Sequence, residues 1–543
     1  MKIYHKCLPY IIPHKLLMAI LITITILSSS VTIISPYITG NFIDMLVENP
    51  NIQSILFFCV VYVCLNIFRI ITSFCVGRLF VIIQSSASYL FLKELISHTQ
   101  QLPLSYITGK DFVNLIQIQS RDTNNLVSFC VTTIQNVVIN GFFLLATISV
   151  LLSLNPTTAF VVVVFLILYI FSYFAFKKPL YSINKLLTES QAAFFSKSFD
   201  QYRFLKFIKA NSMYKDSKME LNKFFKDLYI TILKNQKVQF LFSSTDGLII
   251  IGMQVALFII GGIQIINNQF TIGMFTIFLT YFNIMMNSVK YFFNFGKTYQ
   301  EALVSYNRIN EIHFQAKEEN GNEKPKEIYS ITLENLSFSY NRNIQTELKN
   351  INMKFVKGNI YAIHGKNGSG KSTLIDIILG FYIKETSGKL LFNDKAIENF
   401  EMNYLRKEKI SVSLQEPVLL NTSIIYNISL KEKITLAEKD RIFEYAKMFD
   451  LENYITNFKN DIDTFLTMDN NNLSRGQKQK ISILKVFFSD AEVMIFDEPT
   501  STLDEKSTQF FINHLKTIKY NKIIICVTHV DIDADITYVL GDS

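Results

Sequence analysis

The feature that most constrains this chain is a series of apolar stretches, each long enough to cross a membrane. An α-helix needs about 20 residues to span a hydrocarbon core of ~30 Å. Six stretches before residue 315 reach that length, and they lie near residues 16–36, 53–76, 128–152, 157–176, 242–266 and 271–293. The sequence therefore predicts an all-α transmembrane domain of six helices.

The composition agrees with a chain that is about half membrane-embedded. Hydrophobic residues make up 49%, charged residues only 18%, and the mean hydropathy is +0.25. The net charge of +8 does not indicate a nucleic-acid partner, because most of the basic excess lies in segments predicted to face the cytoplasm. The six cysteines show no CxxC or Cys/His spacing, so we expect neither a disulfide framework nor a zinc site.

The distribution of lysine and arginine predicts the orientation of the six helices. The three expected outer loops, residues 37–51, 153–156 and 267–270, contain no lysine or arginine. The connection 177–241 contains thirteen, and the N-terminal segment carries more. Basic residues stay on the cytoplasmic side. We therefore expect the protein to lie in the cell membrane with both of its termini in the cytoplasm.

Polar segments outside the spans predict how the rest of the chain is organised. The connections 77–127 and 177–241 have sequence patterns typical of helices. Helices of ~30 residues in the second connection would extend ~45 Å into the cytosol. Such helices are able to carry force, and a helical insert without a coupling role is the alternative. Residues 316–328 have the composition of a linker, and alternating strand-like and helical runs follow. The predicted domains are 1–315 and 329–543, the second of α/β class.

A phosphate-binding loop stands near the start of the second domain. It follows a strand-like run at 359–363, precedes a helical run at 373–379, and has the spacing G-x-x-x-x-G-K-S. Glycines let successive backbone N–H groups face an anion. Lys371 would reach the β- and γ-phosphates of a nucleotide. The Ser372 hydroxyl would hold Mg²⁺. The loop consists of Gly365, Lys366, Asn367, Gly368, Ser369, Gly370, Lys371 and Ser372.

Two carboxylates end an apolar strand-like run at residues 493–498, far along the chain. Buried strands of a parallel sheet are apolar on both faces, and ligands gather at their carboxyl ends. We expect Asp497 to bind Mg²⁺ and Glu498 to polarise the water that attacks the γ-phosphate.

The run Leu473–Gln477, with the sequence LSRGQ, brings these features together. With it the chain resembles an ATP-binding cassette (ABC) exporter half-transporter over nearly its whole length. The resemblance implies an ABC-type ATPase that uses ATP and Mg²⁺. Its implied ATP-binding positions, besides the loop and Thr373, are Tyr340, Gln415, Ser474, Gly476, Gln477 and Asp504. Gln415 would also sense Mg²⁺, and His529 would be the switch histidine that acts with Glu498 and Lys371 in hydrolysis.

Three departures from the family pattern stand out. Arg475 replaces the first glycine of the signature pair, and activity is expected to survive because Gly476 remains. Met468 occupies a position where exporters usually have glutamate. The chain also stops soon after its last strand-like run. Apart from these departures, residues 1–15 are short for a fused peptidase domain.

The resemblance also implies a dimer in which each ATP is held between Lys371 of one copy and Ser474 of the other. Because Glu498 and His529 are both present, a homodimer is favoured, with a heterodimer as the alternative. Closure of the dimer would switch the helix bundle between two access states, and hydrolysis would reset it.

Polar residues inside the spans are candidates for a substrate path, although helix–helix contacts or snorkelling would also explain them. They are Arg69, Asn136, Asn140, Asp246, Gln254, Asn283, Asn287 and Lys290. Three functions remain open. The first is ATP-driven export of a peptide, drug or other amphipathic substrate. A flippase for lipid or lipid-linked precursors is the second, and an ATP-regulated channel or regulator is the third.

Overall fold

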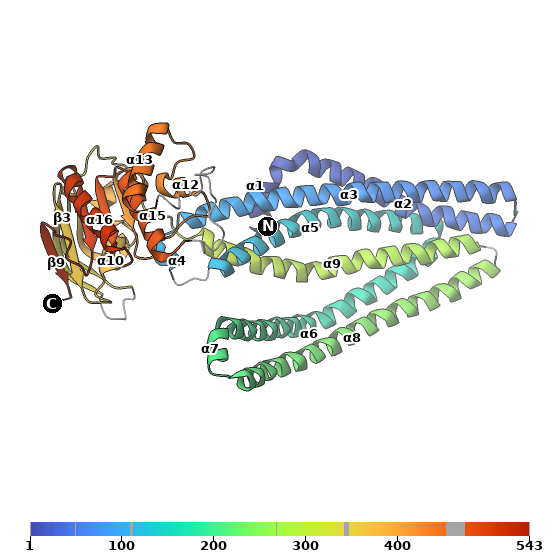
Figure 1. Cartoon of the computed structure of the whole chain (residues 1–543). Helices are drawn as coiled ribbons and strands as arrows, with labels where there is room; N and C mark the ends of the chain where they lie inside the picture. The colour runs from blue at the N-terminus through green and yellow to red at the C-terminus, as the bar shows by residue number, and fades with distance from the viewer. Residues whose placement is uncertain are drawn as a thin grey trace. The chain divides into compact units, whose positions relative to one another are not determined.

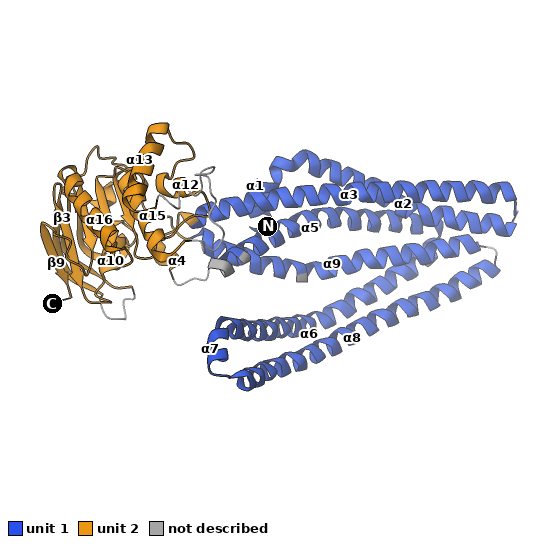
Figure 2. Cartoon of the chain, viewed as in Figure 1, with its two compact units in different colours: residues 1–99, 111–314 blue, residues 100–110, 315–543 orange. Residues whose placement is uncertain are grey.

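A computed structural model of the chain describes residues 2–48, 50–108, 112–267, 269–340, 347–451 and 473–541. The chain forms two compact units, which Figure 2 shows in different colours. The first contains Met1–Thr99 and Asp111–Phe314, and the second contains Gln100–Lys110 and Gln315–Ser543. The segment before the signature motif, including Met468, lies outside the described residues.

The first unit is built of long helices (Figure 1). Six of its helices are long and apolar enough to cross a membrane, which confirms the prediction of six spans. The chain is therefore a multi-pass membrane protein. The helices of this unit are α1 (Lys2–Ile11), α2 (Lys15–Glu48), α3 (Ile52–Gln100), α5 (Phe112–Leu154), α6 (Pro156–Arg203), α7 (Leu205–Ala210), α8 (Tyr214–Ile266) and α9 (Ile272–His313).

The first predicted outer loop, residues 37–51, is mostly helix, so the expected end of the first helix near residue 36 is wrong. Helix α2 continues through Pro36 to Glu48. In this part of the helix Gly40 lies against α9, where an added Cβ would stand 2.4 Å from the Ile277 side chain. Packing against a neighbouring helix outweighs the local tendency of proline to end one.

The contact between α2 and α9 is completed by a carboxylate that caps a helix in another part of the chain. Asp44 accepts hydrogen bonds of 2.6 Å from the Thr271 hydroxyl and of 2.6 Å from the Gly273 backbone N–H. Both donors belong to the start of α9, where Thr271 is itself the N-cap. An anion at this end also opposes the helix dipole.

Pairs of neighbouring helices build the rest of the first unit. Helices α6 and α8 run side by side and are joined by α7 (Figure 1). Helix α5 packs on α9 and α2. An apolar cluster unites five of the helices, with Tyr281 and Phe282 of α9 at its centre. The Tyr281 hydroxyl donates to the Ile33 carbonyl over 2.5 Å, which satisfies its one buried polar atom.

The second unit contains two sheets. Antiparallel strands form the first, in the order β2-β1-β4-β5, and parallel strands form the second, in the order β6-β7-β8-β3-β9. This arrangement is the predicted α/β domain. The strands are β1 (Ser330–Phe338), β2 (Leu348–Val356), β3 (Ile360–Gly365), β4 (Thr386–Phe392), β5 (Lys395–Ala396), β6 (Ile410–Ser413), β7 (Val493–Asp497), β8 (Ile523–Val527) and β9 (Ile536–Leu540).

The parallel sheet separates two apolar cores because its side chains alternate between faces. In β8, Ile523, Ile525 and Val527 pack toward the antiparallel sheet, while Ile524 and Cys526 join the opposite core. The described helices of this unit are α4 (Leu104–Ile107), α10 (Lys371–Ile378), α11 (Met402–Tyr404), α12 (Ile424–Ser429), α13 (Leu436–Met448), α15 (Arg475–Phe488) and α16 (Glu505–Ile518).

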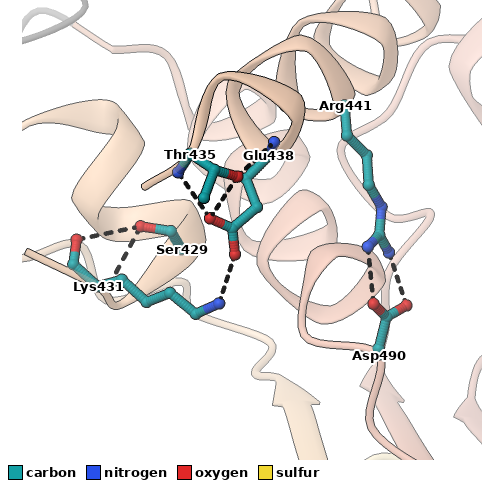
Figure 3. Close-up of polar contacts among 6 residues, drawn as sticks. All are labelled: Ser429, Lys431, Thr435, Glu438, Arg441 and Asp490. Carbon is teal, nitrogen blue, oxygen red and sulfur yellow. Dashed lines mark hydrogen bonds and ion pairs between the residues drawn. The ribbon is translucent and has the colours of Figure 1, made fainter. Parts of the chain in front are cut away.

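Charged contacts at the start and in the middle of α13 fix that helix (Figure 3). Thr435 and Glu438 form a capping box at its start, and Lys431 donates to Glu438 over 2.6 Å. Further along, Arg441 makes a bidentate contact with Asp490, with hydrogen bonds of 2.7 and 2.6 Å. Bidentate geometry is the strongest form of such a pair. It ties α13 to the turn that precedes β7.

The boundary between the units differs from the predicted one in two respects. Residues 100–110 group with the second unit, since Leu104 packs against its apolar core. Residues 316–328, expected as a linker, also group there. Ion pairs hold this segment, among them Glu318 with Arg406 and Lys324 with Glu401. Composition alone cannot distinguish a free linker from one that is pinned by its charges.

We predict that Asp44→Ala lowers the stability of the purified protein by about 1–2 kcal/mol, because it removes the cap of α9. Asp44→Asn keeps one acceptor and should lose less. Thermal unfolding followed by circular dichroism measures both, with the exposed Glu48→Gln as the matched control. Equal stability of Asp44→Ala and the control would show that the cap is unimportant.

Candidate nucleotide site

The predicted site residues come together at one edge of the parallel sheet. The phosphate-binding loop follows β3, Gln415 comes after β6, Glu498 directly follows β7, and His529 lies just beyond β8. These four strands are neighbours in the sheet and parallel, so their carboxyl ends share an edge. Ligands of open α/β sheets bind at such an edge.

The loop adopts a backbone conformation that its glycines permit. Gly368 and Gly370 have φ angles of 82° and 86°, in the left-handed region that other residues avoid. Helix α10 begins directly after Gly370, so its first N–H groups face the loop. The Lys371 ammonium donates to the carbonyls of Gly365 over 2.7 Å and Lys366 over 3.0 Å. This conformation places a cation and a helix N-terminus beside one anion-sized site.

The chemistry of the loop fits a triphosphate with its magnesium ion. The Ser369 hydroxyl is buried and has no hydrogen-bond partner among the described residues, which suits a phosphate oxygen. The Ser372 hydroxyl donates to Asp497 over 2.9 Å, so two of the predicted magnesium ligands are already adjacent. Oxygen ligands are those that Mg²⁺ prefers. No cluster of three or more His, Cys, Asp or Glu occurs in the described ranges, and these ligands do not need one.

Asp497 lies in a setting that favours binding of a cation. Burial is the main cause that raises the pKa of its carboxyl, and the neighbouring charge of Glu498 adds to the effect. The hydrogen bond from Ser372 opposes it. A buried carboxylate whose charge is poorly compensated gains most from a divalent ion.

Glu498 stands in a strained backbone conformation next to two of the predicted residues. Its φ angle is 46°, unusual for a residue with a side chain. The Gln415 amide donates to one carboxylate oxygen over 2.9 Å, and the His529 Nε2 atom lies 3.6 Å from the other. The side chain of Glu498 is 19% exposed. This group is placed as a general base would be, although its role stays a prediction.

Tyr340 reaches the loop through a short hydrogen-bonded series. Thr373 donates its hydroxyl proton to Glu347 over 3.1 Å, so in the 3.2 Å contact Tyr340 is the donor to Thr373. The Tyr340 ring packs edge-on against Phe338 and Tyr382 and remains half exposed. A half-exposed aromatic ring beside the loop is suited to stack on a base. Glu347 was not identified from the sequence.

The signature residues form the first turn of α15. Ser474 is its N-cap and makes a capping box with Gln477. Gly476 leaves no room for a side chain, since an added Cβ would lie 2.7 Å from the Thr502 carbonyl oxygen. Arg475 is 70% exposed and pairs with Glu416 at 3.2 Å. The second glycine of the motif is thus sterically required, whereas the first position has space for arginine.

Asp504 is held by its own chain. Its carboxylate accepts from the Ser507 N–H over 2.8 Å, as the N-cap of α16, and from Lys480 of α15 over 2.6 Å. The hydrogen bond from Lys480 is the main cause that lowers the pKa of this carboxyl. The described residues show no hydrogen bond or ion pair from Ser474, Gly476 or Asp504 to the loop. Their role in binding ATP remains a prediction.

One carboxylate of the site was missed. Asp376 lies in α10, and burial followed by the charge of Asp497 raises its pKa to about 6. A signal was present in the sequence, since an acid interrupts the otherwise apolar run from Leu374 to Leu379. The family motif ends before Asp376, so the motif does not identify this acid.

Comparison with protein families gives two matches. The model of the ABC transporter family matches residues 348–501, and that of the ABC transporter transmembrane region matches residues 18–289. The chain is 28% identical to the multidrug resistance-like ATP-binding protein MdlB of Buchnera aphidicola over 515 residues, which covers 93% of this chain and 87% of the relative.

Two further matches extend over most of the chain. Identity to the transport/processing ATP-binding protein ComA of Streptococcus pneumoniae is 23% over 534 residues, covering 96% of this chain and 72% of the relative. The structure of a bacterial Atm1-family ABC exporter with ATP bound superposes with a TM-score of 0.79 at 17% identity, covering 97% of this chain and 93% of the other. That likeness shows the fold.

We predict that Gly476→Ala lowers the ATPase rate at least about tenfold, because the added methyl group would push against the Thr502 carbonyl and displace the turn. Arg475→Gly, which restores the usual motif at a position with space, should change the rate less than about threefold. Steady-state hydrolysis by the full chain in lipid nanodiscs compares the two. Equal losses in both variants would contradict this steric account.

A second prediction concerns the pH dependence of stability. Because the pKa of Asp376 is higher in the folded chain than the usual 3.8, this carboxyl favours folding at low pH, and its contribution is lost as the pH rises through about 6. Removing the charge with Asp376→Asn should therefore stabilise the protein at pH 8 relative to pH 5. Solvent at the partly buried group limits the effect to about 1–2 kcal/mol.

Thermal unfolding without nucleotide or magnesium measures this difference at the two pH values. Glu398→Gln, which removes an exposed carboxylate of the same unit, serves as the control. A variant profile parallel to that of the wild type would show that Asp376 is charged freely in the folded protein.

Proposed function

Because this chain belongs to the ABC transporter family and carries one transmembrane region with one ATPase domain, we propose that two identical copies of it form the working exporter. The ATPase activity and the ATP-driven export follow from the family. A half-transporter needs a second half, and the identity of that half is the proposal. The observation that supports it most directly is that Lys371, Ser372, Asp497 and Glu498 meet at one sheet edge, so neither copy would lack a catalytic group.

The residues of one copy would bind the nucleotide as follows. Tyr340 would stack on the base, and the N–H groups of residues 365–373 would hold the phosphates with Lys371. Ser372, Asp497 and Gln415 would hold Mg²⁺. The magnesium ion, when bound, would neutralise charge on the β- and γ-phosphates.

Glu498 would polarise the attacking water in this proposal. Its carboxylate is oriented by the Gln415 amide on one side and faces His529 on the other. The low exposure of the side chain keeps it from free solvent. His529 would donate toward the γ-phosphate.

The second copy would complete each site. Ser474 and Gly476 lie at the N-terminus of α15, where free N–H groups favour an anion. Gln477 would support this turn through the capping box, and Asp504 would fix the neighbouring turn through Lys480. Each ATP would thus be bound between two chains, and its binding would favour the closed dimer.

The membrane orientation and the cargo belong to the same proposal. The lysine and arginine distribution supports cytoplasmic termini in a cell membrane. The names of the relatives, multidrug resistance-like and transport/processing, support a drug, peptide or other amphipathic cargo. A lipid or lipid-linked precursor flippase and an ATP-regulated channel remain as alternatives.

A polar stripe on α9 supports a path for such a cargo. Its members recur every three or four residues, which places them on one face of the helix. The opposite face carries the buried side chains of the apolar cluster. Asn283, Asn287 and Asn294 are exposed on this face, and exposed amides within an apolar span favour water or a partner over lipid. The stripe consists of Thr276, Thr280, Asn283, Asn287, Lys290 and Asn294.

We predict that Glu498→Gln binds ATP with unchanged affinity but hydrolyses it at least about a hundredfold more slowly, because only the base is removed. Glu505→Gln, which neutralises an exposed acid of the next helix, should hydrolyse normally. ATP binding and phosphate release are measured on the same nanodisc preparations. Normal turnover in Glu498→Gln would refute the assigned role.

A further inference from the structure

An ion pair interrupts the apolar interior of the membrane unit beside the polar stripe. The Lys290 ammonium of α9 lies 2.7 Å from the Asp246 Oδ2 atom of α8. The lysine side chain is 30% exposed in the single chain, and that of the aspartate is 16% exposed. Charges within a span are costly, and they persist where they pair or serve a pathway.

Only one of the two carboxylate oxygens of Asp246 is paired with Lys290. The other oxygen of Asp246, Oδ1, is buried and has no hydrogen-bond partner among the described residues. A buried acceptor without a donor costs free energy, and more so when it is charged. The missing element at this position is a donor. An ammonium on a flexible stem supplies one oxygen, whereas a group with several N–H donors would satisfy both.

Aromatic rings of a third helix pack against α9 within one turn of Lys290. Tyr169 of α6 is buried. Tyr169 and Tyr173 both contact the Phe293 ring of α9, with centroid separations of 5.7 and 4.1 Å. Helices α6, α8 and α9 thus contribute side chains to one region. Aromatic faces stabilise desolvated cations.

We propose that Asp246 binds a cationic group of the cargo, and that Lys290 occupies it when no cargo is bound. This inference rests on the proposed function, since it supplies the chemical class of the exported molecule. The cargo is an amphipath with a guanidinium or a comparable cation. Its fork of N–H donors would replace the single contact of Lys290 and reach Oδ1 as well. Lys290 is the more exposed partner and belongs to the polar stripe, so its ammonium would remain on a polar face after release.

A purely structural ion pair is the competing explanation. It would hold α8 against α9 and would have no preference for cargo charge. The two explanations differ in what happens when the charges are exchanged. If the pair is structural, exchanging the two charges leaves the choice of cargo unchanged. If it is a cargo site, the exchange reverses the preferred charge of the cargo.

The test uses three synthetic peptides that are identical except for one arginine, citrulline or glutamate. Binding to the full-length protein in nanodiscs is measured by fluorescence anisotropy. The wild type should bind the arginine peptide about tenfold or more tighter than the citrulline peptide, since a hydrogen-bonded charge is lost. Asp246→Asn should remove the difference. The double variant Asp246→Lys/Lys290→Asp should favour the glutamate peptide.

The control is Asn66→Leu in α3, whose amide donates to the Tyr62 carbonyl of its own helix over 2.8 Å. It should keep the preference of the wild type. Equal affinity of the wild type for the arginine and citrulline peptides, including no binding of either, overturns the inference. So does a charge-exchanged variant that retains the preference for arginine.

Failure of this inference is separable from failure of the proposed function. ATP-dependent uptake of all three peptides into inverted vesicles at equal rates would leave export intact and remove Asp246 as the charge site. A preference for arginine in binding without any ATP-dependent uptake would support the charge site and contradict export of this cargo.

Discussion

The hydrogen bond between Ser372 and Asp497 is the interaction on which the catalytic unit depends. It joins the phosphate-binding loop after β3 to the carboxyl end of β7, two strands that are separated in the sheet by β8. Strand β7 is fully buried, so its last residues cannot shift without disturbing both cores. Asp497 and Glu498 are therefore held in fixed positions at the carboxyl edge of the parallel sheet, where Gln415 and His529 also lie. A site of this kind requires little reorganisation when a nucleotide binds.

The sequence was sufficient to predict the six spans, the α/β domain and the sheet edge at which the motif residues meet. The spans were predictable because lipid imposes a minimum apolar length, and the site because ligands gather at the carboxyl ends of parallel strands. The details that were missed depend on tertiary contacts. The first outer loop is mostly helix and packs on α9 at Gly40, and ion pairs such as that of Glu318 hold residues 316–328 on the second unit.

Missed site residues have the same origin. Glu347 enters the site only through its contact with Thr373, and Lys480 only through Asp504. Neither lies in a motif. The structure also explains a departure that the sequence left open. Position 475 projects outward and has space for arginine, whereas Gly476 faces a carbonyl oxygen at a distance that excludes any side chain.

Two carboxylates in the membrane unit, Asp44 and Asp246, differ in how their oxygens are paired. Asp44 accepts hydrogen bonds at the start of α9, while one oxygen of Asp246 has no donor among the described residues. The first carboxylate caps a helix, and we propose that the second binds a cationic group of the cargo.

The central claim is that two copies of this chain enclose each nucleotide between the loop of one and the signature turn of the other. A photo-crosslinking amino acid at position 474, in a mixture of isotope-labelled and unlabelled chains, tests it most directly. With ATP and magnesium, mass spectrometry should find crosslinks from this position to residues 365–373 of a second chain, and these should disappear without nucleotide. Crosslinks confined to a single chain under both conditions would contradict the account.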